Sequence, residues 1–344
     1  PVRGGQKLLT AALEAGLDWP HDCRVGSCGM CRCVLRKGAI KPLTDFVYTL
    51  SADELRNGTI LACQATLKSD VEIEVTLGAG RAPVEQLAGR IAAMTPLTHD
   101  IVELAIALER PAFGAARAGQ YVDVHLDRLD APRSYSFARA PCHEDGNHVR
   151  FLVRHVPGGG FTDWLFGGDR RGTTLGLRGP FGDFHQRPGA GRMICVAGGS
   201  GLAPIHALVE DGAATGIERD CVVLFGARTQ RDLYYLEHFA TFAAAWHGTL
   251  DVVPVLSAEP DGSDWRGARG LVTEHLATVA GAGGFGATDQ AYLCGPPAMV
   301  DAGIDALRAL GMRDDAVFFD RFLDASTQPG GREGLASPPA AARP

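Results

Sequence analysis

One cysteine-rich stretch, DCRVGSCGMCRCVL (residues 22–35), places four cysteines within eleven positions. Cys23, Cys28 and Cys31 follow the spacing C-x4-C-x2-C, and Cys63 comes 32 residues later in ILACQA. Three thiolates from one loop and a fourth from a distant segment are the ligand arrangement of a plant-type [2Fe–2S] cluster. The glycines between the cysteines allow the tight turns that a loop around a cluster needs. The spacing therefore predicts an iron–sulfur centre held by these four thiolates.

Two other uses of clustered cysteines, a zinc site and a disulfide scaffold, fit the sequence less well. Zinc sites usually combine two C-x2-C pairs, or one such pair with a histidine pair, and only one C-x2-C pair occurs here. A secreted disulfide scaffold would be shorter and would carry an even number of cysteines, whereas this chain has nine. The surplus Cys33 lies on a predicted strand, RCVLRKG, and we expect it to be a small packed residue rather than a further ligand.

The overall composition is that of a globular protein with two or three domains. The chain has 344 residues, of which 46% are hydrophobic and 21% charged, and its formal net charge is −7. This negative balance argues against a nucleic-acid partner, which requires clustered Lys and Arg. No apolar run approaches the roughly 20 residues that span a bilayer, and the start has no signal-peptide pattern. We therefore expect a cytoplasmic protein without membrane insertion.

Short elements around the cysteines predict a small α/β domain over residues 1–78. QKLLTAALEAG has apolar residues at helical spacing, and DVEIEV alternates as a strand does. SADELRNG is typical of a second short helix, which Ser51 would cap with Glu54 three positions later. This order of elements resembles the β-grasp ferredoxin. Such domains begin with a β-hairpin, whereas only PVRGG precedes the first helix, so we expect a missing native start or a truncated hairpin.

The remaining chain changes pattern twice after a predicted linker over residues 79–87. Between 88 and 188, alternating runs such as DIVELAIAL and HVRFLVRHV predict an antiparallel β-barrel. From 189 to 325, short apolar runs such as MICVAGG and CVVLFGA alternate with helical stretches, which predicts a parallel sheet with helices on both faces. Residues 326–344 lack periodicity and are expected to be disordered. The predicted fold class is a multidomain combination of α/β and β architectures.

The barrel region carries one candidate ligand site, in APRSYSFA. Arg133, Ser134, Tyr135 and Ser136 lie on a predicted strand, so the first and third share one face and the two serines share the other. Arg suits a phosphate, Tyr can stack on a flat ring, and Ser can hydrogen-bond a ring nitrogen. The glycine turn at residues 158–162 adds weight, since it leads into a helix whose N-terminus can hold a pyrophosphate. The alternative is a hairpin turn that simply needs glycine.

The C-terminal region carries two more candidate sites at strand ends. In CVAGGSGLAP a strand is predicted to end at Ala197, and a helix to begin near Ala203 with Pro204 at its first position. This is a dinucleotide-binding type of turn, although Pro204 replaces the third glycine of G-x-G-x-x-G. In YLCGPPAMV, Cys294 ends a strand at the carboxyl edge of the sheet, where ligands bind in such folds. That position favours a role beside a nicotinamide over a merely packed thiol.

Together, these motifs resemble the ferredoxin–NADP⁺ reductase superfamily fused to an N-terminal ferredoxin. In detail they are similar to the reductase components of bacterial aromatic-ring dioxygenases and di-iron monooxygenases. The resemblance covers about residues 1–325 and rests on an ordered set of motifs: the cluster cysteines, AGQY, R-x-Y-S, PGG, GPFG, GGSGLAP and CGPP. It implies FAD, a 2Fe-2S cluster and NADH as cofactors.

The resemblance also implies roles for individual residues. Arg133 would contact the FAD pyrophosphate, Tyr135 would stack on the isoalloxazine, and Ser136 would approach flavin N5. The other residues implied are Ser134, Gly160, Thr162 and the backbone of Phe161 for FAD; Gly198, Gly199, Ser200, Gly201 and Pro204 for the NAD pyrophosphate; Cys294, Gly295 and Pro296 for the nicotinamide; and Phe318 or Phe322 as an aromatic near the flavin.

The implied activity is electron transfer from NADH through FAD to the cluster, and then to an oxygenase component or its ferredoxin. Flavin can accept a hydride and release electrons singly, so no general acid or base is required. NADH is expected over NADPH. Asp232 would suit a ribose 2′-OH, whereas the neighbouring Arg228 and Arg231 would suit a 2′-phosphate.

Two rival functions stay open at this point. A self-sufficient reductase acting directly on a small molecule, such as a deoxysugar reductase of similar build, would have a substrate pocket beside the cluster. A binding or sensing module without turnover would have lost the cluster cysteines or the flavin motif, and neither is lost.

Overall fold

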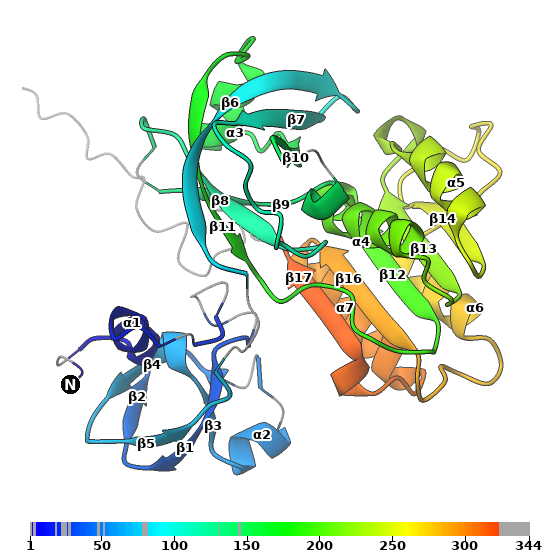
Figure 1. Ribbon diagram of the computed structural model, residues 1–344. Helices are drawn as coiled ribbons and strands as arrows, with labels where there is room; N and C mark the ends of the chain where they lie inside the picture. The colour runs from blue at the N-terminus through cyan, green and yellow to red at the C-terminus, as the bar shows by residue number, and fades with distance from the viewer. Residues whose placement is uncertain are drawn as a thin grey trace, which may run out of the picture.

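A computed structural model of the chain forms three units along the sequence (Figure 1). Four predicted features fall outside the described residues: the cluster ligands Cys23 and Cys28, the helix cap Ser51 and the tail 326–344. Within the described part of the chain, no helix is long and apolar enough to cross a bilayer. The structure describes residues 2, 5–17, 19–21, 26, 29–46, 49–50, 52–77, 82–129, 131–143 and 146–322.

The N-terminal unit, blue in Figure 1, combines two short helices with short strands. Strands β3, β1 and β5 form an antiparallel sheet in that order, and β2 pairs with β4. Helix α1 buries Leu8, Leu9 and Ala12, which have the spacing of one helix face. The predicted helices and strands of this unit are confirmed. The elements are α1 (Leu8–Glu14), β1 (Arg32–Lys37), β2 (Ile40–Pro42), α2 (Ala52–Arg56), β3 (Thr59–Leu61), η2 (Ala62–Gln64), β4 (Ala65–Leu67) and β5 (Glu72–Glu74).

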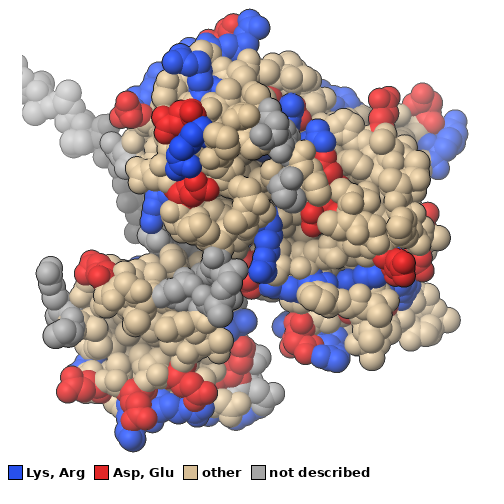
Figure 2. All heavy atoms as spheres, in the orientation of Figure 1, with Lys and Arg blue, Asp and Glu red and all other residues tan. Residues whose placement is uncertain are grey.

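Charged side chains on β1 and β5 are paired with each other. Arg36 Nε donates to Glu74 at 2.7 Å, and Lys37 Nζ donates to Glu72 at 2.6 Å. Figure 2 shows acidic and basic side chains interspersed over the lower part of this unit. Exposed pairs of this kind contribute little stability. They do, however, leave this side of the unit without a strong field of one sign.

The middle unit is an antiparallel sheet curled into a nearly closed barrel. The strand order is β10-β7-β6-β11-β8-β9, and a bridge between Phe137 and Phe151 joins the two ends. The barrel prediction is confirmed, but β6 begins at Glu85, inside the segment predicted as linker. Its first residues pair with β11, from Glu85 opposite Gly179 onward. The elements are β6 (Glu85–Pro96), β7 (Ile101–Leu108), β8 (Tyr121–His125), β9 (Arg133–Ser136), η3 (Pro141–His143), β10 (His148–Arg154), α3 (Gly160–Phe166) and β11 (Thr174–Phe181).

The C-terminal unit is a six-stranded sheet in which every neighbouring pair is parallel, in the order β15-β14-β13-β12-β16-β17. Helices α4 and α5 cover one face, and α6 and α7 cover the other, as predicted (Figure 1). Central β12 is buried at every position, which explains its continuous apolar run. The elements are β12 (Met193–Gly198), η4 (Gly199–Gly201), α4 (Leu202–Thr215), β13 (Cys221–Ala227), η5 (Gln230–Asp232), α5 (Leu236–Ala245), β14 (Leu250–Leu256), β15 (Ala268–Arg269), η6 (Val272–His275), α6 (Leu276–Ala280), β16 (Gln290–Gly295), α7 (Pro297–Ala309), η7 (Asp314–Ala316) and β17 (Val317–Arg321).

Candidate functional site

Two of the four predicted cluster cysteines are described, and they lie side by side. Cys31 precedes β1, Cys63 lies in η2, and the backbone N–H of Cys63 donates to Cys31 Sγ at 3.4 Å. Both side chains are 2% exposed. In the loop before them, Gly26 has φ +89°, and a Cβ there would lie 2.8 Å from Gln64 Cγ. A buried sulfur that receives a backbone N–H fits an iron–sulfur ligand.

Cys33 differs from this pair in its surroundings. It lies on β1, in register with Ile60 of β3, and its side chain is 3% exposed. Burial raises the pKa of the Cys33 thiol to about 12. The prediction that Cys33 is a small packed residue is confirmed by its place in the hydrophobic core of this unit.

Strand β9 presents the predicted flavin residues with graded exposure. Arg133 and Ser134 are exposed, Tyr135 is half-buried and Ser136 is buried. Ser134 Oγ donates to Asp123 Oδ1 of β8 at 2.8 Å. Burial raises the pKa of Tyr135, so its phenol stays neutral. The strand thus offers a cation at its start and a flat neutral ring further along.

The predicted phosphate turn lies directly beside β9. The ring of Phe161, in α3, lies 5.5 Å from that of Tyr135, and its side chain is 1% exposed. The hydroxyl of Thr162 receives the N–H of Val156 at 3.1 Å and donates to the carbonyl of Val156 at 2.9 Å. A Cβ at Gly159 would lie 2.7 Å from Thr162 Oγ1, so the turn needs glycine there. The N–H groups of Gly158 and Gly159 are bonded to Asp163 and Val156, so a phosphate would meet the N–H groups of the first turn of α3, at residues 160–162.

The glycine-rich turn after β12 differs in detail from the prediction. The strand continues to Gly198 and α4 begins at Leu202, so Pro204 is the third helical residue and not the first. Its missing N–H still costs nothing, because the first four N–H groups of a helix have no partner within the helix. A Cβ at Gly201 would lie 2.3 Å from the carbonyl oxygen of Cys294. The turn and the end of β16 are therefore in direct contact, which brings the second and third predicted sites together.

The contacts at the end of β16 distinguish Phe318 from Phe322, the two aromatic residues predicted as candidates for a place near the flavin. Cys294 is fully buried, and burial raises the pKa of its thiol. The N–H of Phe322 donates to the carbonyl of Gly295 at 2.9 Å, so Phe322 follows the strand end directly. Phe318 instead packs its ring 5.2 Å from that of Tyr292, within the sheet.

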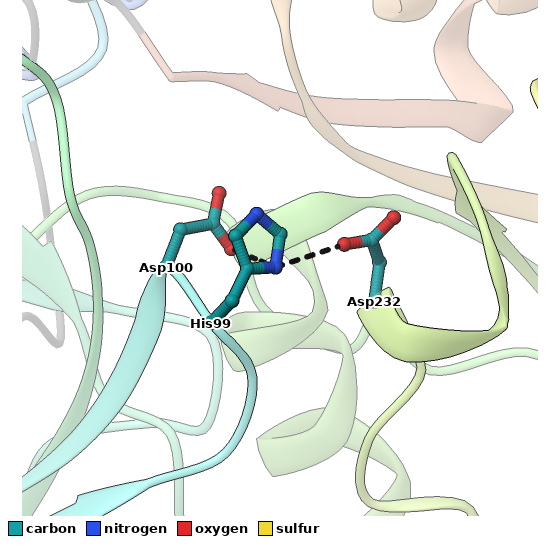
Figure 3. A group of neighbouring side chains, drawn as sticks. All are labelled: His99, Asp100 and Asp232. Carbon is teal, nitrogen blue, oxygen red and sulfur yellow. Dashed lines mark ion pairs between the residues drawn. The ribbon is translucent and has the colours of Figure 1, made fainter.

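A further contact between the barrel and the parallel-sheet unit, that of His99 with Asp232, was not predicted from the sequence. His99 Nδ1, from the turn after β6, lies 3.3 Å from Asp232 Oδ1 and 3.8 Å from Asp100 Oδ1 (Figure 3). Arg154 already bonds Asp100 at 2.9 Å, and the N–H of Thr229 bonds Asp232 at 2.8 Å. The group therefore places His99 of the barrel against one oxygen of Asp232, whose other oxygen receives the N–H of Thr229. No local pattern in the sequence relates these distant residues.

Three family models match the chain, one in each unit. They are a 2Fe-2S iron-sulfur cluster binding domain over residues 1–68, an oxidoreductase FAD-binding domain over 88–186 and an oxidoreductase NAD-binding domain over 195–303. The predicted cofactor set of a 2Fe-2S cluster, FAD and a nicotinamide nucleotide is therefore confirmed.

Proteins similar over nearly the whole chain are electron-transfer components. The chain is 44% identical over 325 residues to the electron transfer component of the xylene/toluene monooxygenase of Pseudomonas putida, with 94% of this chain and 90% of that protein covered. The crystal structure of an Amycolatopsis cytochrome P450 reductase has a TM-score of 0.74 and 34% identity, with 94% of this chain and 96% of that chain covered. The ferredoxin reductase in carbazole 1,9a-dioxygenase has a TM-score of 0.67 and 28% identity, with 93% and 94% covered. These likenesses support an oxygenase reductase component over a deoxysugar reductase.

Proposed function

Because the chain belongs to the family of iron–sulfur flavoprotein reductases that serve oxygenases as electron-transfer components, we propose that its own acceptor is an aromatic-hydrocarbon monooxygenase. The chain is an NAD(P)H-dependent oxidoreductase whose electrons pass through FAD and a 2Fe-2S cluster to an oxygenase component. The observation that carries the proposal about the acceptor is the 44% identity with the electron transfer component of a xylene/toluene monooxygenase.

The three units divide this work between them. Bound FAD would supply the change from a two-electron donor to a one-electron acceptor. The protein contributes position: the parallel sheet holds the nucleotide, the barrel holds the flavin, and the N-terminal unit carries the exit for electrons. No side chain is needed as a general acid or base.

We assign the four cluster ligands to Cys23, Cys28, Cys31 and Cys63. The contact between Cys31 and Cys63 supports this assignment. For FAD we assign Arg133 to Ser136 and the backbone at residues 160–162, which Tyr135 and Phe161 bring together. For the nucleotide we assign the residues of GGSGLAP and CGPP, whose turns touch through Gly201 and Cys294.

We assign the aromatic beside the flavin to Phe322 rather than Phe318. Phe322 is tied through its N–H to Gly295, at the end of the strand where the nicotinamide would lie. Phe318 is committed to other partners, since its ring packs on Tyr292 and lies 5.1 Å from the guanidinium of Arg187. Of the two aromatics, Phe322 is therefore the one at the strand end, whereas Phe318 lies opposite Tyr292 within the sheet.

We assign NADH as the preferred donor. Beyond the end of β13, hydrogen bonds from Gln230 lower the pKa of Glu259, so this carboxylate stays ionised at neutral pH. Asp232 is held nearby by Thr229 and His99. These two carboxylates would accept hydrogen bonds from a ribose 2′-OH, and we weigh them above the neighbouring Arg228 and Arg231, of which Arg231 lies 3.9 Å from Asp232.

We also propose a cytoplasmic location and domains over residues 1–78, 85–188 and 189–325 with a tail at 326–344; the predicted linker 79–87 is shortened to 79–84, because β6 begins at Glu85. The location is supported by the use of a nicotinamide nucleotide and by a cluster that needs reduced thiols. The boundaries are supported by the separate sheets of the three units.

The proposed acceptor is tested by exchanging reductase components. The electron transfer component of the Pseudomonas putida xylene/toluene monooxygenase is replaced by this chain, and toluene oxidation is measured per NADH consumed. The carbazole 1,9a-dioxygenase system, with its reductase replaced in the same way, is the control. We expect coupled product formation with the monooxygenase and NADH oxidation without product in the control. Coupling only with the dioxygenase would overturn the proposed acceptor.

A further inference from the structure

Helix α4 of the parallel-sheet unit is hydrogen-bonded to the barrel through two buried side chains one turn apart, His206 and Glu210. His206 Nδ1 lies 2.8 Å from the carbonyl oxygen of Ala138. The two oxygens of Glu210 receive different donors: Arg139 Nε at 2.6 Å and the N–H of Ala140 at 3.0 Å. One face of α4 thus binds three successive residues that follow β9 (Figure 1).

The chemistry of this contact fixes the orientation of the His206 ring. The side chain is fully buried, and burial lowers its pKa to about 4, so the ring is neutral. A carbonyl oxygen can only accept a hydrogen bond. Nδ1 of His206 therefore carries the hydrogen and donates to the carbonyl of Ala138. Nε2 is then the acceptor for His238 Nδ1, which lies 3.1 Å away. Both ring nitrogens have partners, so rotation of the ring would leave buried polar atoms unpaired.

Tyr235 makes a second contact between the two units, next to the contact of His206. The ring of Tyr235 lies 4.3 Å from that of His238, and its hydroxyl donates to Glu103 of β7. Arg150 of β10 also bonds Glu103, at 2.9 Å. Tyr235 has φ +61°, a left-handed conformation that is uncommon for a bulky residue and persists only where the surroundings require it. The aromatic group on α4 and α5 is therefore held against the barrel at two places.

The contact of His206 and Glu210 with residues 138–140 joins the segment that follows the proposed flavin strand to the helix that follows the proposed nucleotide turn. Ala138 is two residues after Ser136 of the proposed flavin strand. On the other side, α4 begins directly after the glycine turn 199–201, and His206 is on its second turn. A displacement at this contact would thus move the nucleotide turn relative to the flavin strand, while leaving each binding site intact within its own unit.

We propose that His206 and Glu210 are positioning residues for hydride transfer, because they tie the nucleotide turn of α4 to the backbone that leaves the flavin strand. This proposal rests on the proposed function. In the step concerned, a hydride leaves C4 of the nicotinamide for flavin N5 and one proton is taken up from solvent. Transfer of this kind requires near contact of the reacting atoms, so a misplacement of about 1 Å costs roughly a hundredfold in rate.

Four variants of the FAD-loaded protein test this role. His206→Leu removes the donor to Ala138, whereas His206→Asn keeps a donor at the position of Nδ1. Glu210→Gln keeps an acceptor for the N–H of Ala140 but removes the charge opposite Arg139. Ile304→Ala, on α7 in the hydrophobic core of the opposite sheet face, is the matched control for lost packing.

Four quantities are measured for each variant without oxygen. They are FAD content, the dissociation constant for NAD⁺, the rate of flavin reduction at saturating NADH, and the long-wavelength absorbance of nicotinamide stacked on flavin. We expect His206→Leu to slow flavin reduction by about tenfold or more and to weaken the stacking absorbance. FAD content and NAD⁺ affinity should stay within about twofold, since the binding residues are untouched. His206→Asn should restore most of the rate, and Ile304→Ala should leave it unchanged.

Several outcomes would overturn the proposal. Flavin reduction at the wild-type rate in His206→Leu and Glu210→Gln would do so, as would an equal loss of rate in Ile304→Ala. If His206→Leu does not fold, Glu210→Gln decides by the same criteria, with a slower reduction and a weaker stacking absorbance expected. A wild-type protein that NADH does not reduce would instead refute the proposed function itself.

Discussion

Cys63 donates its backbone N–H to the sulfur of Cys31 across 3.4 Å, although 32 positions separate the two residues. The contact forms because η2 brings Cys63 against the end of the cysteine loop, where the N–H of Ala62 also donates to the carbonyl of Cys31. A thiolate that receives an N–H is stabilised in its charged form, which is the form that binds iron. The cysteine loop and the segment of Cys63, which are predicted to share a cluster, are therefore in contact at the sulfur of Cys31.

Replacing Cys63 tests the modular use of the three units. We expect Cys63→Ser to abolish the cluster absorbance and the electron paramagnetic resonance signal of the reduced protein. NADH-driven reduction of ferricyanide should stay within about twofold, because it needs only the flavin and nucleotide units. Cys33→Ser is the matched control and should retain the cluster, since Cys33 is a packed thiol. Loss of both activities in Cys63→Ser would contradict the division of labour.

Removing the cation at the start of β9 tests the FAD assignment. Arg133→Ala should raise the dissociation constant for FAD by about tenfold or more, because a charge-assisted hydrogen bond contributes about 1.5–3 kcal/mol. Flavin content after dialysis and fluorescence titration of the apoprotein measure this. Arg110→Ala, an exposed arginine of the same unit that pairs with Glu85, should leave FAD affinity unchanged. Equal flavin retention in both variants would refute the role of Arg133.

The close approach of the glycine turn to β16 predicts a strong effect of a single methyl group. Gly201→Ala would place a Cβ 2.3 Å from the carbonyl of Cys294, so the turn or the strand must move. We expect a loss of about 1–3 kcal/mol in stability of the nucleotide-binding unit, together with weaker NAD⁺ binding. Thermal unfolding and isothermal titration measure the two effects. Gly262→Ala, with no atom within 4 Å of the added Cβ, should change neither.

The buried His206 predicts a loss of stability in mild acid. Its pKa is lowered by burial from 6.5 to about 4, so between these values the unfolded chain binds a proton that the folded chain does not. Stability from this group is therefore complete above about pH 6.5 and falls as the pH is lowered, by about 3 kcal/mol at pH 4. Urea unfolding at pH 8 and pH 5 should show a smaller difference for His206→Asn than for the wild type. An equal difference in the two proteins would show that His206 does not set this dependence.

Much of the fold was predictable because its signals are local. The apolar spacing of α1 marks its one buried face, and the continuous apolar run of β12 marks a strand that is buried on both faces. The alternating pattern correctly predicted β7 and β10 as strands, although β7 is buried at consecutive positions and so on both faces. Element boundaries were predicted less accurately. Strand β12 runs one residue further and α4 begins earlier than predicted, because hydrogen bonds with neighbours decide where an element ends.

The iron–sulfur ligand spacing, the order of barrel and parallel sheet, and the short motifs at strand ends could all be predicted, since they depend on residues close together in the chain. The contacts between distant residues became known from the folded arrangement alone: His206 with Ala138, Asp232 with His99, and Phe322 rather than Phe318 at Gly295. Periodicity tells which face of an element is buried but not which element covers it. That partner is set by the strand order and by the packing of one unit against another.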